Sequence, residues 1–99
     1  MKFGKTKNII GSRGSMTKQQ KIKAVEDYLG NRGMFYESGE IAKAELLGKY
    51  WFILIKDEPE VELYDKTDMY GECIDGFCRK DFKWNKTYMR KCVTGEVYE

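Results

Sequence analysis

Six apolar residues follow one another without interruption from Tyr50 to Ile55, the longest apolar run in the chain. A strand buried on both faces reads as a continuous apolar run, whereas a half-exposed strand alternates apolar and polar residues. The run therefore predicts a central strand over 49–56. It is far shorter than the roughly 20 residues of a membrane-spanning helix, and the basic N-terminus lacks the apolar stretch of a signal peptide. We therefore expect a cytoplasmic protein without a membrane partner.

The residues after this run read as further strands. Val61 to Tyr64 alternates apolar and polar residues after a turn that contains Pro59, which predicts a hairpin with the central strand. Breaks at Gly76 and Asn85 separate three more strand candidates, and a short candidate precedes the central run. These candidates are 69–75, 77–84, 87–93 and 34–36.

The clearest helix signal lies near the N-terminus. Thr17 and Gln20 have the spacing of a capping box, and apolar residues follow at helical spacing up to Leu29. Gly30 then supplies a helix stop. The pattern predicts an amphipathic helix over 18–29.

Residues 40–47 fit two structures. Ile41, Ala44 and Leu47 have the spacing of a short helix that ends at Gly48, and a strand is the alternative. One clear helix followed by antiparallel strands predicts an α+β fold, with the N-terminal helix packed on a curled antiparallel sheet or small open barrel of about five strands. The expected core consists of Ile22, Val25, Leu29, Phe35, Leu47, Phe52, Leu54, Val61, Leu63, Ile74, Phe82 and Val93.

The 99 residues are the size of one domain, which we expect over 17–99. Residues 1–16 read as a flexible basic arm, because acidic residues are absent from 1–25 while seven basic residues lie there. The chain has no histidine, which excludes histidine-based catalysis and metal binding. Its three cysteines predict free thiols, with a Cys73–Cys78 bridge across a hairpin as the alternative. We therefore expect neither an enzyme, nor a metal, nor a cofactor.

Two groups of charged residues are candidate interaction surfaces. Aromatic and basic residues alternate over 77–92, an arrangement that can contact bases and phosphates. Together with the arm, this hairpin supplies candidate contacts for a protein partner or nucleic acid: Lys5, Lys7, Arg13, Arg79, Lys80, Lys83, Trp84, Lys86, Tyr88 and Arg90. A candidate acidic docking surface on the other hairpin comprises Asp57, Glu58, Glu60, Glu62 and Asp65.

The chain is short, rich in Lys, Glu and Tyr, and 14% aromatic. This composition is similar to that of the small accessory proteins that phages and mobile elements direct against host machinery. The resemblance implies a non-enzymatic protein that docks on a protein partner, such as one that handles nucleic acid, and inhibits or modulates it. Direct nucleic-acid binding through the arm and the 77–92 hairpin is the alternative. Where exposed, the expected interface anchors are Tyr36, Trp51, Tyr64, Tyr70 and Trp84.

Overall fold

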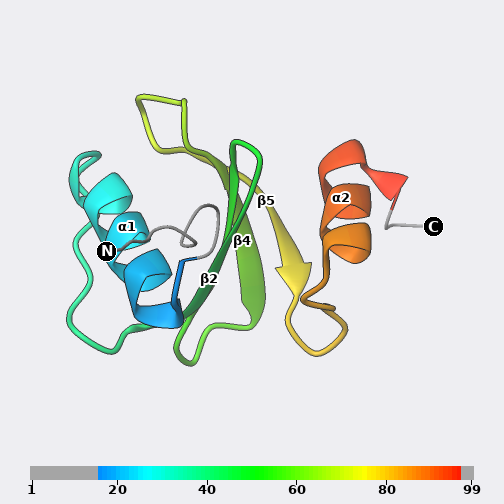
Figure 1. The fold of residues 1–99 in the computed structure, drawn as a ribbon, viewed down its shortest axis with the longest axis horizontal. Coiled ribbons are helices and arrows are strands. Elements are labelled where there is room, and N and C mark those ends of the chain that lie inside the picture. Colours follow the sequence, from blue (N-terminus) through cyan, green and yellow to red (C-terminus); the bar gives the residue numbers. More distant parts are fainter. Residues whose placement is uncertain (1–15, 97–99) are drawn as a thin grey trace, which may run out of the picture.

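The computed structural model of the chain describes residues 16–96, as two helices and a four-stranded antiparallel sheet. The sheet is open and has the order β2-β3-β4-β5, and the helices lie on its opposite faces (Figure 1). The elements are α1 (Lys18–Gly30), β2 (Ile41–Leu47), β3 (Tyr50–Ile55), β4 (Glu60–Asp65), β5 (Cys73–Cys78) and α2 (Lys86–Thr94). The α+β class is confirmed, but the sheet has four strands, not five, and a second helix is present. The predicted arm, with Lys5, Lys7 and Arg13, falls outside the described residues apart from Met16.

β3 is an inner strand that pairs with β2 on one side and β4 on the other. Trp51 and Ile53 belong to the apolar cluster under α1, whereas Phe52 belongs to the cluster under α2. All three are buried, with Phe52 and Ile53 at 0% exposure. The prediction of a central strand buried on both faces is confirmed. β3 is therefore shared by both halves of the core.

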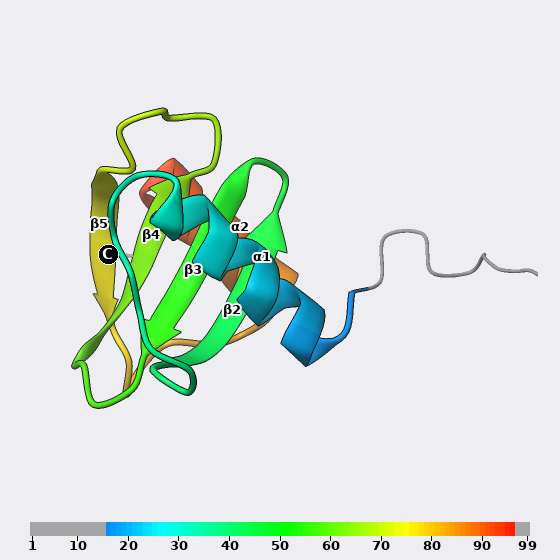
Figure 2. The ribbon, with the colours of Figure 1, turned by 90° about the vertical axis from the view of Figure 1, so that its left-hand side faces the viewer.

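α1 begins with the expected capping box. The Thr17 hydroxyl accepts a hydrogen bond from the Gln20 amide at 3.1 Å, and the Gln20 side chain accepts one from the Thr17 amide at 2.9 Å. Val25 and Leu29 are buried against the sheet, which α1 crosses diagonally (Figure 2). The helix matches the predicted range 18–29. Within residues 16–96, no helix is both long and apolar enough to cross a membrane.

Residues 40–47 form a strand, so the preferred prediction of a helix is wrong and the alternative is correct. β2 pairs with β3 over its whole length, and Ala44 lies opposite Ile53. Gly48 has φ +61° and belongs to the turn that joins β2 to β3, rather than ending a helix. The helical spacing of apolar residues arises because an irregularity between Ile41 and Lys43 shifts the strand's alternation.

The predicted strand over 34–36 is absent. This segment belongs to the irregular connection between α1 and β2. Met34 and Tyr36 pack on the α1 side of the sheet, and Phe35 projects outward, 82% exposed. Ile74, also expected in the core, is 53% exposed on the edge strand β5. Both residues are wrong predictions for the core.

The C-terminal strands are also predicted wrongly, because residues 77–92 form a strand, a loop and a helix rather than a hairpin. The Asn85 side chain accepts a hydrogen bond from the Tyr88 amide at 2.8 Å and so caps α2. Met89 and Cys92, one helical turn apart, are buried, and Gly95 ends the helix in the left-handed conformation that glycine favours. Where the sequence predicts two strands, over 69–75 and 77–84, the structure has one, β5.

Candidate functional site

The aromatic residues of 77–92 point into the core rather than outward. The Phe82 ring meets those of Trp84 and Tyr88 edge-on, with centroids 4.7 Å and 5.1 Å apart. Phe82 is buried, and the other two are half-buried at the margin of the α2 cluster. Lysines cover these outer rings, with the Lys43 Nζ 5.2 Å from the Trp84 centroid and the Lys83 Nζ 6.0 Å from that of Tyr88. The rings therefore anchor the layer of α2 and leave cations at its surface.

Six basic residues lie in the loop after β5 and in α2, and all of them are exposed. α2 buries Met89 and Cys92 against the sheet, so its other side faces solvent. The loop that precedes α2 carries three of the six. We define the basic surface as Arg79, Lys80, Lys83, Lys86, Arg90 and Lys91.

The basic surface is not neutralised by the rest of the described chain. Residues 79–94 contain six basic residues and one acidic residue, a net charge of +5, whereas residues 16–78 contain eight basic and 13 acidic residues, a net of −5. Glu96, just beyond α2, adds one further negative charge beside Arg90 and Lys91. The salt bridges among residues 16–96 join Lys21 or Lys43 to Glu45, Lys23 to Asp27, and Lys49 to Asp65. None includes a residue of 79–94. Positive charge is therefore concentrated in residues 79–94, and negative charge in the part of the described chain before them.

The five predicted acidic residues do not form one surface. Asp57, Glu58 and Glu60 lie exposed at the turn between β3 and β4. Asp65 lies at the far end of β4, where hydrogen bonds from Thr67 and then the charge of Lys49 lower the pKa of its carboxyl. Glu62 lies between them and accepts a hydrogen bond from the Tyr64 hydroxyl at 2.8 Å. Burial, followed by the charges of Glu62, Glu40 and Glu58, raises the pKa of Tyr36, so Glu62 stays near the acidic turn while Asp65 lies apart from it.

The loop between β4 and β5 is bonded to Arg32, just after α1, and displays apolar side chains. The Arg32 guanidinium lies 4.1 Å from the Tyr28 ring centroid and donates hydrogen bonds to the carbonyls of Asp68 and Tyr28 at 2.8 Å and 3.2 Å. Gly71, at φ +66°, packs so close to Arg32 that an added Cβ would lie 2.8 Å from its side chain. Met69 and Tyr70 nevertheless remain 73% and 75% exposed.

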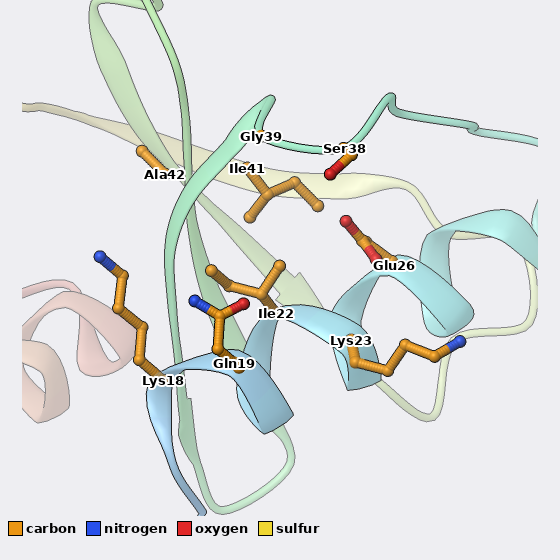
Figure 3. Close-up of a pocket in the computed structure, with 9 residues that line it drawn as sticks. All are labelled: Lys18, Gln19, Ile22, Lys23, Glu26, Ser38, Gly39, Ile41 and Ala42. Atoms are coloured by element: carbon orange, nitrogen blue, oxygen red, sulfur yellow. The ribbon is translucent and has the colours of Figure 1, made fainter.

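A groove of about 610 Å³ lies between α1 and the start of β2 (Figure 3). Ile22 and Ile41 form its floor, and the long side chains of Lys18, Lys23 and Glu26 stand at its rim. Its lining contains no cysteine, tyrosine or carboxylate pair. The groove thus offers an apolar floor with a charged rim.

Two of the three thiols, those of Cys73 and Cys92, lie where the thiolate is disfavoured. Burial raises the pKa of the Cys92 thiol to about 11, and burial followed by the charge of Glu62 raises the pKa of Cys73. Cys73 and Cys78 lie five residues apart on the same strand, roughly 16 Å in extended chain, which is too far for the alternative disulfide. Within residues 16–96, no cluster of three or more Cys, Asp or Glu side chains could hold a metal ion.

The predicted basic residues from Arg79 to Arg90 are all exposed, and they lie on a loop and a helix instead of a hairpin. The structure adds Thr87, Lys91 and Thr94, which are exposed on α2 beside Arg90. The sequence signal for them was the cap at Asn85 followed by apolar residues at helical spacing. Comparisons of the chain with protein-family models, with curated protein sequences and with solved structures find no match.

Proposed function

We propose that this chain is a non-catalytic nucleic-acid-binding protein that contacts phosphates through the basic surface. The observation that carries the proposal is the net charge of +5 on residues 79–94, exposed and without a salt bridge to any described residue. Clustered, exposed Lys and Arg side chains bind the phosphate backbone by releasing its condensed counterions. This clustering favours nucleic acid over the protein partner that the sequence first suggests.

The expected protein-interface anchors give weaker support, because most of them serve the core. Trp51 and Tyr64 are only 3% and 4% exposed, and Tyr36 and Trp84 are half-buried. Of the five, Tyr70 alone is exposed enough to act as an anchor. The cations, by contrast, are all accessible.

The test is binding of a fluorescent oligonucleotide at low salt, followed by polarisation. Charge reversal in the triple variant Lys80→Glu, Lys83→Glu, Lys86→Glu should weaken binding at least tenfold. The control reverses three exposed lysines outside the basic surface: Lys18→Glu, Lys23→Glu, Lys66→Glu. The proposal would be refuted if the protein bound neither DNA nor RNA, or if both triple variants lost the same amount of binding affinity.

A second candidate function is docking on a protein partner, as an inhibitor or modulator. It is favoured by the exposed Met69 and Tyr70 on the loop between β4 and β5, because the hydrogen bonds from Arg32 to this loop reduce the entropy that it loses on binding. Met69→Ala with Tyr70→Ala should then abolish co-purification of a stoichiometric partner, while Phe35→Ala should not. Equal recovery with both variants would exclude this loop as the docking site.

A further inference from the structure

Given the proposed function, we infer that the nucleic acid is duplex DNA and that α2 is the element that enters its major groove. The inference deepens the proposed function, because it names the form of nucleic acid and the part of the surface that reads it. Three observations support it. α2 has the size and the exposed polar side chains of a groove-binding helix, the aromatic rings beside it are packed on Phe82, and acidic residues lie at one end of the basic surface.

α2 has the dimensions of a groove-binding helix. Its nine residues give a length of roughly 13 Å, and a helix with its side chains is about 10–12 Å across. The major groove of B-form DNA is about 12 Å wide and admits one helix. α2 forms the outermost layer of the molecule on its side of the sheet (Figure 1), so it can enter a groove without displacing another described element.

The outward side of α2 carries only polar and basic residues. Lys86, Thr87, Arg90, Lys91 and Thr94 are all exposed, and their spacing of one, four, five and eight residues places them on one helical face. Four of them, with Glu96 beyond the helix end, line a shallow hollow of about 240 Å³. Arg and Thr side chains are suited to base edges, and Lys side chains to phosphates.

Single-stranded nucleic acid is a poorer fit to the same surface. Proteins that bind single strands stack bases on exposed aromatic rings. Next to the basic surface, however, Trp84 and Tyr88 pack on Phe82 and lie beneath lysines. The strongly exposed aromatic rings among residues 16–96, Phe35 and Tyr70, belong to the acidic part of the chain.

The acidic turn between β3 and β4 limits the contact to α2 and the loop before it. The Arg79 amide donates to the Pro59 carbonyl at 3.0 Å, and its guanidinium donates to the Glu58 carbonyl at 2.8 Å. Asp57, Glu58 and Glu60 thus lie beside one end of the basic surface, where they repel a phosphate backbone. The DNA is thereby directed towards Lys83 and α2. An A-form RNA duplex is a poorer fit for a different reason: its major groove is too deep and narrow for α2 to enter.

The experiment compares three probes of one sequence at one salt concentration: a 20-base-pair DNA duplex, its single strand and the matching RNA duplex. We expect the DNA duplex to bind at least tenfold more tightly than the other two. Tighter or equal binding of the single strand or of the RNA duplex would overturn the inference while leaving the proposed function intact. Failure of all three probes to bind would overturn both.

A matched pair of variants tests the role of α2 itself. Thr87→Glu and Gln19→Glu each place a carboxylate at the second residue of a helix, where the helix dipole favours it and folding is preserved. Thr87→Glu should weaken binding of the DNA duplex at least tenfold, and Gln19→Glu should change it less than twofold. Equal effects of the two variants would show that α2 does not face the DNA.

Discussion

The two faces of the sheet use their charged residues differently. On the α1 side, Arg32 and Tyr28 tie the helix to the loop after β4, and Lys21 pairs with Glu45 at 2.7 Å. On the α2 side, the layer is anchored by Phe82 and its aromatic neighbours, while its cations are exposed. Charge on the first face contributes to the fold. On the second, the Arg79 guanidinium also binds the Glu58 carbonyl at 2.8 Å, but the cations of α2 form no salt bridge to a described residue. Substitutions that distinguish these two uses test the comparison.

The largest effect should come from the strand that the two faces share. Phe52→Ala empties a fully buried site in the α2 cluster and should lower the free energy of unfolding by about 3–5 kcal/mol. Ile53→Ala, on the α1 side of the same strand, should cost about 2–5 kcal/mol. Urea unfolding followed by circular dichroism measures both. Two separate transitions in either variant would contradict a core that unfolds as one unit.

Removing an arginine from each face gives the sharpest contrast. Arg32→Ala removes hydrogen bonds to three carbonyls, those of Asp68, Tyr28 and Lys66, and the contact with the Tyr28 ring, so it should cost about 1–3 kcal/mol of stability. Arg90→Ala removes an exposed side chain and should change stability by at most about 0.5 kcal/mol. Matched urea titrations decide the question. Equal costs would mean that charge on the α2 face also holds the fold.

Alkaline pH should weaken the α2 side through Cys92. The folded state raises this thiol's pKa from 9.0 to about 11, so the protonated form is the one that folding favours. The associated stability is complete below about pH 9 and is lost as pH rises towards 11, by roughly 1–3 kcal/mol. Unfolding free energies of the wild type and Cys92→Ala, measured from pH 8 to 11, should converge. Parallel curves would show that the thiol does not contribute.

The sequence predicts best those elements whose signals are local. The apolar run from Tyr50 specifies β3, and the Thr17 capping box specifies α1, because neither depends on a distant partner. β2 was predicted as a helix because its identity depends on pairing with β3, and its irregularity near Ile41 disguises the alternation. α2 had local signals at Asn85 and Gly95, but Asn85 was interpreted as a break between two strands rather than as a helix cap.

The candidate site shows the same division between local and non-local information. That residues 79–91 are basic is plain from the sequence, because charge needs no fold to be counted. Which side chains are exposed depends on the fold. Trp84 and Tyr88 are partly buried because each packs edge-on against the buried Phe82 ring. The acidic residues Glu60 and Asp65 are close in sequence, yet they lie at opposite ends of an extended strand.

The most direct test of the central claim is the salt dependence of DNA-duplex binding. Each phosphate contact contributes a slope of about −0.9 to the plot of log K against log salt concentration. Lys86→Gln with Arg90→Gln should therefore make the wild-type slope shallower by nearly 2, while unfolding free energies stay within about 0.5 kcal/mol. Lys18→Gln with Lys23→Gln, which removes the same charge from α1, should leave the slope unchanged. Identical slopes for the wild type and both variants would contradict the claim that charge on the α2 face serves a nucleic-acid partner.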